Sequence, residues 1–455
     1  MSKSTASPTD DLAKFTDALL KAAKIAGADG ADAIAVDGSS ATIDVLKGKL
    51  EHAERSEGVD IGLRVLIGQR QACVSASDTR DYTITQMAER AVAMAKEAPE
   101  DAHIGLASLD QLATDWNVDA LDMNDPAAPP SPEELQELAQ RAEAAAQNVE
   151  GVSQVQATSA GYGNRRVHLA TSNGFSGGYA RSGYSVSTVA ITGSGSDMER
   201  DYYGDSRTYF SDLYSPEHIG KIAGQRAVER IGARQPKTGF FPVLFDERVS
   251  ATLIGHLLGA INGSAIVRGG SFLRDSLGEQ VLPKGISLIE DPHRARTSGS
   301  RPFDGEGLLT QRRAIVEDGI LTGWTLDLAN ARALGMESTA NASRGTSSPP
   351  SPSSGNVTLT QGNMTRDELL AEMGTGLLVT SMIGSSINAN TGDYSRGASG
   401  FWVENGELQY AVNECTIAGN LKDMLRTFTP ANDARTHLSR VVPSLLLDGM
   451  TLAGG

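Results

Sequence analysis

The sequence has only two cysteines, Cys73 and Cys415, and they lie far apart among its 455 residues. They form no Cys-x-x-Cys pair and no zinc-ligand cluster, which argues against a disulfide framework or a structural zinc module. Free cysteines are among the most buried residue types. We therefore expect both side chains to be buried as reduced thiols.

Positive charge is also in short supply. Lys and Arg number 40 against 56 Asp and Glu, so the formal net charge is −16. Nucleic-acid binding draws its affinity from Lys and Arg that neutralise phosphates, so this balance excludes DNA and RNA as expected partners and gives no support to binding of anionic membranes. No stretch approaches 18 uninterrupted apolar residues, and the opening MSKSTASPTDDLAKF lacks the apolar core of a signal peptide. We expect a cytoplasmic protein.

Most short catalytic signatures are missing as well. The sequence contains no GxxxxGK[ST], no GxSxG, no HExxH and no GxGxxG between a strand and a helix. Its seven histidines are scattered, at positions 52, 103, 168, 218, 256, 293 and 437. A catalytic zinc needs about three protein ligands at fixed geometry, and no two histidines share a helical face here. The residues therefore predict no zinc site in this chain.

Capping and turn signals are what the sequence does have. Helices are predicted at 11–26, 83–97, 131–148, 215–232, 247–261 and 366–373, several of them after a Ser or Thr cap. Hairpin turns are predicted at Gly68-Gln69, Asn173-Gly174, Asp318-Gly319 and Asn405-Gly406. These signals indicate a mixture of helices and mostly antiparallel strands.

The order of these elements predicts three domains. Residues 1–120 give an N-terminal α/β domain, and residues 121–235 give a central α+β segment of helix, antiparallel sheet and helix. Residues 236–455 form a β-rich C-terminal domain, in which the Ser- and Pro-rich segment 341–356 is expected to be irregular.

Three clusters could carry chemistry. His256 lies in the apolar helix ATLIGHLLGAI, as a hydrogen-bonded core histidine or as the remnant of a metal site. The segment Phe303-Asp304-Gly305-Glu306-Gly307 is either an ordinary turn or a pair of carboxylates for acid–base work. The segment Gly392–Gly397 (GDYSRG) is either a tight loop with an internal Asp–Arg pair or part of a substrate-binding surface.

Long stretches of the sequence resemble the TldD/PmbA peptidase family, on its PmbA (TldE) side, which is also labelled modulator of DNA gyrase. The resemblance is clearest in SATLIGHLLGAINGSAIVRGGSFLRDSLGEQVLP, RPFDGEGLLTQRRAIVEDGILTGWTLDLANARALG and GDYSRGASGFWVENGELQYAVNECTIAGNLKDM. In the N-terminal part, EGVDIGLRVLIGQRQACVSASD is similar to the family's first domain. The resemblance implies a barrel-like, mostly antiparallel C-terminal domain, and the hairpin signals agree with it.

The resemblance also bears on zinc. The TldD-type subunit carries a His-Glu-x-x-x-His motif in which both histidines bind zinc and the glutamate is the general base. Alignment on the Gly-His pair places Ala251, Thr252 and His256 at the positions of His, Glu and His. The TldD-type site takes a further Cys ligand from the last segment, but DARTHLSRVVPSLLLDGMTLAGG has none and Cys415 lies upstream. The resemblance thus implies no catalytic or metal residue here.

The family implies a function shared between two chains. A TldD-type zinc subunit would supply metal and base, and this chain would complete a cavity that holds unfolded peptide for proteolysis, without a cofactor of its own. Asp393, Tyr394, Ser395 and Arg396 are then candidates to line the peptide tunnel. Two alternatives stay open: a regulatory protein-binding module of the gyrase-modulator type, and a stand-alone homodimeric hydrolase. Homodimers of the isolated chain stay open too.

Overall fold

The computed structural model describes residues 9–454. The strands of its N-terminal half form one curved antiparallel sheet. Its six strands run in the order β3-β2-β1-β4-β5-β6. They are β1 (Gly30–Leu46), β2 (Lys49–Ile67), β3 (Arg70–Ala76), β4 (Val152–Thr171), β5 (Ser176–Thr192) and β6 (Glu199–Arg207). Strand β1 pairs with β4 from Asp32↔Thr171 to Val45↔Thr158. The predicted N-terminal and central segments therefore share a single sheet, which their local sequence did not indicate.

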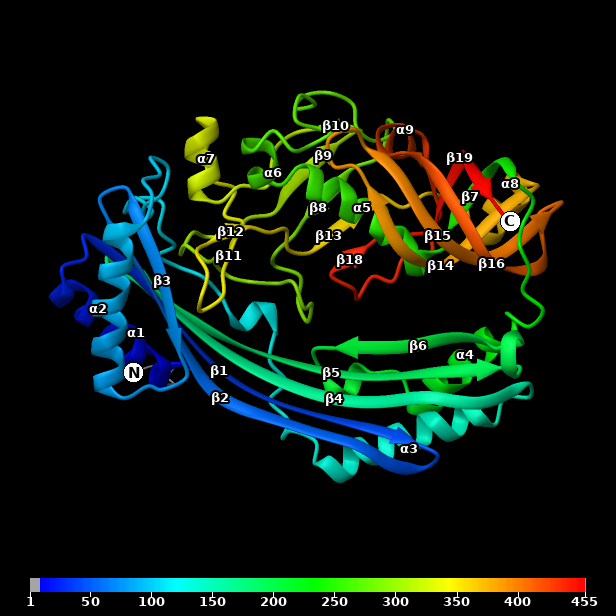
Figure 1. Ribbon diagram of the computed structural model, residues 1–455, viewed down its shortest axis with the longest axis horizontal. Coiled ribbons are helices and arrows are strands. Elements are labelled where there is room, and N and C mark those ends of the chain that lie inside the picture. Colours follow the sequence, from blue (N-terminus) through cyan, green and yellow to red (C-terminus); the bar gives the residue numbers. More distant parts are fainter. Residues whose placement is uncertain (1–8, 455) are drawn as a thin grey trace.

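Four helices cover the outer, convex face of this sheet, and the C-terminal domain lies on its concave side (Figure 1). They are α1 (Asp10–Ala26), α2 (Asp81–Glu97), α3 (Pro132–Gln147) and α4 (Pro216–Val228). The predicted capping box is present, since Ser131 Oγ accepts from Glu134 N and the Glu134 carboxylate accepts from Ser131 N. Their buried faces are apolar, as in Leu135 and Ile219. No helix in residues 9–454 is both long and apolar enough to cross a membrane.

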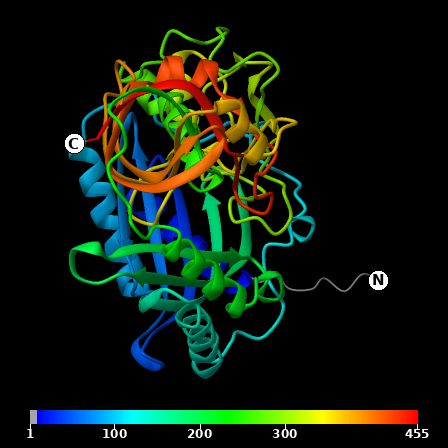
Figure 2. The same cartoon turned by 90° about the vertical axis from the view of Figure 1, so that its right-hand side faces the viewer.

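The C-terminal domain is built on a closed five-stranded barrel (Figure 2). Its strands are β7 (Gly239–Phe245), β14 (Gly376–Ile387), β15 (Asp393–Glu404), β16 (Glu407–Asn420) and β19 (Leu445–Ala453). The ring closes where β19 pairs with β16, from Thr416↔Ala453 to Ala418↔Thr451. All pairs are antiparallel except β14 with β7. The predicted barrel-like, mostly antiparallel domain is confirmed.

A second, mixed sheet and short helices surround the barrel. The sheet order is β10-β9-β8-β13-β18. The strands are β8 (Leu288–Glu290), β9 (Arg313–Glu317), β10 (Ile320–Leu321), β13 (Val357–Leu359) and β18 (Arg440–Val441), and β17 (Thr429–Pro430) pairs with β19. The helices are α5 (Glu247–Ala260), α6 (Gly263–Val267), α7 (Leu328–Leu334), α8 (Arg366–Met373) and α9 (Leu421–Thr427). Three 3-10 turns lie at Asp119–Leu121, Gly195–Asp197 and Phe210–Asp212.

The predicted hairpin turns of this domain have the expected backbone. Asp318 and Asn405 have φ of 48° and 55°, and the glycines that follow have φ of 84° and 79°. Two successive positive φ values are what a type I′ turn requires, which explains the Asp-Gly and Asn-Gly pairs. The segment 341–356 is less irregular than predicted, because it contains the paired strands β11 (Ala342–Ser343) and β12 (Ser351–Pro352).

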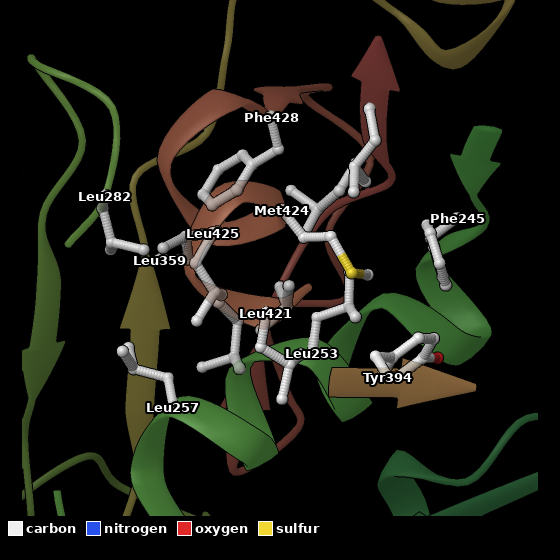
Figure 3. Packing of buried hydrophobic residues seen from close by; sticks show 14 of the residues in the cluster. Phe245, Leu253, Leu257, Leu282, Leu359, Tyr394, Leu421, Met424, Leu425 and Phe428 are labelled. Carbon is white, nitrogen blue, oxygen red and sulfur yellow. The ribbon is translucent and has the colours of Figure 1, made fainter. Parts of the chain in front are cut away.

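The largest apolar core fills the barrel and the space toward α5 and α9 (Figure 3). Trp402, Tyr394 and Phe245 are its largest fully buried side chains. Leu253 and Leu257 of α5 meet Leu421 and neighbouring residues of α9 in this cluster. The barrel thus fixes one face of α5, the helix that carries the three positions of the zinc-motif alignment.

Candidate functional site

Helix α5 holds Ala251, Thr252 and His256 on a well-anchored element. The helix begins after Asp246, whose side chain accepts from the backbone N–H of Arg248 at 3.1 Å. Leu253 and Leu257 are buried in the core, whereas Ala251, Thr252 and His256 are half-buried. Thr252 and His256 are four residues apart, so their side chains share one face of the helix.

His256 lies half-buried beside the barrel strand β15. Its ring packs edge-to-face on Tyr394, with 5.9 Å between centroids and 74° between planes. Its Nε2 is buried and has no hydrogen-bond partner within residues 9–454. Burial lowers the pKa of His256, and the nearby Arg396 cation lowers it further. The imidazole is therefore neutral at physiological pH. One interpretation of the sequence was a core histidine satisfied by hydrogen bonds, and that prediction is wrong for Nε2.

The other two motif positions offer no metal chemistry. Thr252 Oγ1 donates to the carbonyl of Val249 at 2.7 Å, a bond within its own helix. Ala251 packs partly buried against the apolar core and has no lone pair. A catalytic zinc needs three protein ligands, and these positions provide one imidazole. The residues at the motif do not fit a zinc ion, and within residues 9–454 no three His, Cys, Asp or Glu side chains form a group that could hold a metal.

Neither cysteine replaces the missing zinc ligands. Cys415 is buried in the core, and burial raises the pKa of its thiol to about 11. Because a thiolate is the form that binds metal or attacks a substrate, this thiol is inert. Cys73 is half-buried on β3, so the prediction of two buried thiols is right for Cys415 and wrong for Cys73.

The segment Gly392–Gly397 is not a loop. From Asp393 onward it is β15, paired with β14 on one side and β16 on the other. In the described structure no ion pair joins Asp393 and Arg396, so the loop interpretation is wrong in both parts. The two glycines that suggested a turn have different roles. Gly392 has a φ of 84° just before β15, as a turn requires, whereas Gly397 serves close packing within the strand, because a Cβ there would lie 2.6 Å from Ile383 Cγ2.

Successive side chains of β15 point to opposite faces of the strand, so the four predicted tunnel residues form two pairs. Tyr394 points into the core, where its hydroxyl contacts Met382 Sδ at 3.4 Å and burial raises its pKa to about 12. Arg396 Nε donates to the Gly384 carbonyl at 2.8 Å. Asp393 lies at the exposed strand start and accepts from Thr391 Oγ1 at 2.6 Å. The structure therefore gathers Tyr394 and Arg396 around His256, while Asp393 and Ser395 alternate with them.

The segment Phe303–Gly307 is a turn with two buried carboxylates. Asp304 accepts from the backbone N–H groups of Glu306, Leu308 and Ala342 at 2.9 to 3.0 Å. Glu306 Oε2 accepts from Leu328 N at 2.9 Å, at the start of α7. Burial raises the pKa of both groups, that of Glu306 to about 8. The turn interpretation is confirmed. The two carboxylates are buried and accept hydrogen bonds from backbone N–H groups.

One group of side chains has no signature in the sequence. Four arginines, Arg165, Arg181, Arg301 and Arg344, line a cavity of about 260 Å³. Arg165 and Arg181 come from the N-terminal sheet, and the other two come from the C-terminal domain. No periodicity or motif spacing links these four positions, so only the folded chain shows that they meet.

Comparison with protein families covers most of the chain. Residues 31–95 match PmbA/TldA metallopeptidase domain 1, residues 125–231 match the central domain of that family, and residues 238–454 match its C-terminal domain. Metalloprotease PmbA of Escherichia coli O157:H7 is 37% identical over 427 residues, which span 94% of this chain and 92% of that protein. A metalloprotease PmbA homolog of Haemophilus influenzae is 37% identical over 412 residues, 89% of this chain and 88% of that protein.

Solved structures have the same fold. A candidate modulator of DNA gyrase from Bacteroides thetaiotaomicron matches with a TM-score of 0.90 and 26% identity, over 98% of this chain and 100% of that one. TldE from Thermococcus kodakarensis matches with a TM-score of 0.84 and 20% identity, over 97% and 100% of the two chains. The second likeness shows the fold alone.

Proposed function

The chain belongs to the PmbA/TldD metallopeptidase family, and we propose that it is the PmbA (TldE)-type subunit of a cytoplasmic two-subunit peptidase whose zinc is held by a TldD-type partner. The observation that carries the proposal is helix α5, where Ala251 and Thr252 occupy the positions of a zinc ligand and a general base. The helix is well formed and its apolar face is buried. This chain therefore has the helix of the zinc motif but lacks the side chains that would bind zinc and act as the base.

The side chains near His256 support a role in binding. Zinc in the partner would activate water for hydrolysis, and this chain would form part of the cavity wall. His256 is neutral, Tyr394 keeps its proton, and Arg396 carries the charge of the cluster. A cation beside two neutral rings can hold a carbonyl or carboxylate of a peptide, whereas Arg396 has no lone pair to accept a proton and the lowered pKa makes His256 a weak base. We propose Asp393, Tyr394, Ser395 and Arg396 as tunnel residues. This cluster supports Arg396 and the buried Tyr394 behind it, whereas Asp393 and Ser395 alternate with them along β15 and rest on the family resemblance.

The curved sheet supports a peptide as the substrate class. A groove of about 800 Å³ lies along β1, β2, β4 and β5, and its lining includes Gly38, Gly58, Gly163 and Gly183. Glycine and serine leave the backbone accessible along such a groove, which suits recognition of an extended chain with little demand on its side chains. An unfolded peptide fits these features better than a rigid folded protein does.

Reconstitution with a TldD-type subunit tests the proposal. We expect the pair to cleave an unfolded peptide, and we expect Arg396→Ala to lower kcat/KM about tenfold, the loss of roughly one hydrogen bond to a charged group. Asp393→Ala should have a smaller effect, because Asp393 bonds to Thr391 and Asn420 at the strand start. Arg274→Ala is the matched control, since Arg274 is exposed and its one ion pair within residues 9–454 is with its neighbour Asp275.

Size-exclusion chromatography of each pair shows whether the variants still assemble. Unchanged turnover by an assembled Arg396→Ala pair would remove β15 from the tunnel. Salt-insensitive binding to a gyrase subunit, with no TldD-type protein captured from the native host, would replace the proposal by the gyrase-modulator alternative. Chelator-resistant cleavage by the purified chain would favour the stand-alone hydrolase.

A further inference from the structure

The cavity of four arginines lies where the C-terminal domain meets the concave face of the N-terminal sheet. One wall comes from β1, β4 and β5, with Ile34, Val167 and Tyr179, and the other comes from residues 299–305 and 342–344. Arg165, Arg181, Arg301 and Arg344 all line it, and Asp304 is the one carboxylate among the described lining residues. Such a concentration of cations is unexpected in a chain with a formal net charge of −16.

These cations have little negative charge to pair with. Among residues 9–454, no carboxylate lies within ion-pair distance of Arg165, Arg181 or Arg301. Arg181 donates to the carbonyls of Ser298 and Ser300, and Arg301 donates to those of Ala342 and Ser353. Neutral carbonyls hold the guanidinium groups in place but do not neutralise them. The cavity is therefore pre-organised and positively charged.

Two of the donors are buried and have no partner. Arg301 Nε and Arg344 Nη2 make no hydrogen bond within the described part of the chain. Only 1% of the Arg344 side chain is exposed, and its Nη1 is occupied by Asp32. A buried donor without an acceptor costs about 1 to 3 kcal/mol, and more when it is charged. Both residues line the cavity, so an acceptor in it that reached either atom would remove that cost.

Asp304 cannot act as that acceptor. Its Oδ1 accepts from Glu306 N and Leu308 N, and its Oδ2 accepts from Ala342 N. The like charges also affect each other: burial lowers the pKa of Arg181, and the nearby Arg165 and Arg301 cations lower it further. The missing component of the site is thus an anion with several acceptor oxygens.

The rest of the lining restricts the kind of anion. Ile34, Val167, Leu169 and Phe303 give the cavity an apolar wall beside the arginines. Its volume of about 260 Å³ is below the roughly 300 Å³ at which pockets for whole drug-sized ligands begin. A carboxylate attached to a hydrocarbon side chain fits both features, and the fork of a guanidinium matches a carboxylate with two parallel hydrogen bonds. A bare phosphate would leave the apolar wall without a contact.

The position of the cavity identifies the source of that carboxylate. The groove along the sheet shares Arg165 and Arg181 with the cavity, so the two spaces adjoin. We propose that the arginine cavity binds the C-terminal carboxylate and last side chain of an unfolded peptide whose preceding residues lie in the groove. This inference rests on the proposed peptide-binding function and adds that the peptide is held by its C-terminal end.

Fluorescence anisotropy with the full-length chain tests the proposal. The probe is an unstructured peptide with an N-terminal dye and a C-terminal leucine, prepared as the free acid and as the amide. A third peptide amide carries glutamate as its last residue. We expect the free acid to bind at least tenfold more tightly than either amide. Arg165→Gln should remove most of this difference and should fold normally, because Arg165 is exposed and has no ion-pair partner in the described structure.

Arg301→Gln should remove the difference as well, and Arg274→Gln, outside the cavity, should preserve it. Circular dichroism shows whether Arg301→Gln folds; if it does not, Arg165→Gln decides. Equal affinity for acid and amide, equal affinity for the glutamate amide, or unchanged discrimination in Arg165→Gln would overturn the proposal. Equal binding of acid and amide would leave the proposed peptide-binding function intact. That function is tested by the reconstitution with a TldD-type subunit, and a chain that fails to activate its partner would contradict it whatever the anisotropy assay shows.

Discussion

The barrel core and the charged part of the contact between the domains differ in the kind of side chain that they bury. The barrel core is apolar, with Trp402, Tyr394 and Phe245 among its fully buried side chains. The contact between the N-terminal sheet and the C-terminal domain contains an apolar cluster that includes Phe175 and Phe303. Beside it lies a group of charged residues with little exposure, here called the charged seam: Asp32, Arg64, Asp304, Glu306 and Arg344. Apolar burial needs no specific partner, whereas buried charges must be paired. The difference predicts that the barrel core supplies more of the free energy of folding, whereas the seam requires specific partners on both domains.

The charged seam depends on residues 341–356, a segment that the sequence predicts to be irregular. Arg344 lies in the Ser- and Pro-rich stretch 341–356 and pairs with Asp32 of β1, which also binds Arg64 at 2.5 Å. The same stretch presses on β2, because a Cβ on Gly62 would lie 2.1 Å from the Thr346 carbonyl oxygen. A segment that was predicted to be irregular therefore joins the two domains.

The largest expected effect tests the barrel side of the comparison. Trp402→Ala removes a fully buried indole that packs edge-to-face on Phe241, with centroids 5.0 Å apart. Truncation of a buried aromatic costs about 3 to 5 kcal/mol, and we expect a loss of about 4 kcal/mol in the free energy of unfolding, measured by urea denaturation. Phe240→Ala, at a 73% exposed position, should change it by less than about 0.5 kcal/mol. Similar losses in both variants would contradict an apolar barrel core as the source of stability.

A somewhat smaller effect is expected at the seam. Asp32→Asn leaves Arg64 and Arg344 buried, with 4% and 1% of their side chains exposed, and without their shared counter-charge. Removal of one partner of a buried ion pair costs about 3 to 5 kcal/mol, and we expect about 3 kcal/mol because the amide still accepts a hydrogen bond. The control Asp275→Asn, in an exposed pair, should give no measurable change. A neutral effect of Asp32→Asn would mean that the seam does not join the domains.

The smallest effect concerns the pH dependence of the seam. The unfolded carboxyl of Glu306 loses its proton near pH 4.5, whereas burial and then the Asp304 charge raise the pKa in the folded chain to about 8. Between these values the unfolded chain binds fewer protons, so this group lowers stability as pH rises from about 5 to 8. Glu306→Gln should reduce the loss of stability between pH 5 and pH 8, measured by urea midpoints, because the amide oxygen still accepts from Leu328 N. An equal loss in both proteins would show that Glu306 ionises freely in the folded state.

Local structure was the part that the sequence predicted well. The boxes Ser131/Glu134 and Thr365/Glu368 cap α3 and α8, and the Asp318-Gly319 and Asn405-Gly406 turns join paired strands. In each case the residues that set the backbone are within a few positions of one another, so their chemistry can be read along the chain.

Long-range pairing could not be predicted in the same way. The β1–β4 ladder joins residues more than 100 positions apart, such as Asp32 and Thr171, and the alternation of each strand does not specify its partner. Gly397 does not form the predicted turn, because glycine occurs both in turns and at close strand contacts. The four cavity arginines each look like an ordinary surface charge in the sequence, and only the contact between the domains brings them together.

The zinc content of the purified chain tests the central claim most directly. After removal of loosely bound metal, we expect elemental analysis to find far less than one zinc per chain, and we expect no peptide cleavage until a TldD-type subunit is added. Ala251→His should not change either result, because it would supply two imidazoles and no base. One zinc per chain together with chelator-sensitive cleavage by the chain alone would contradict the account.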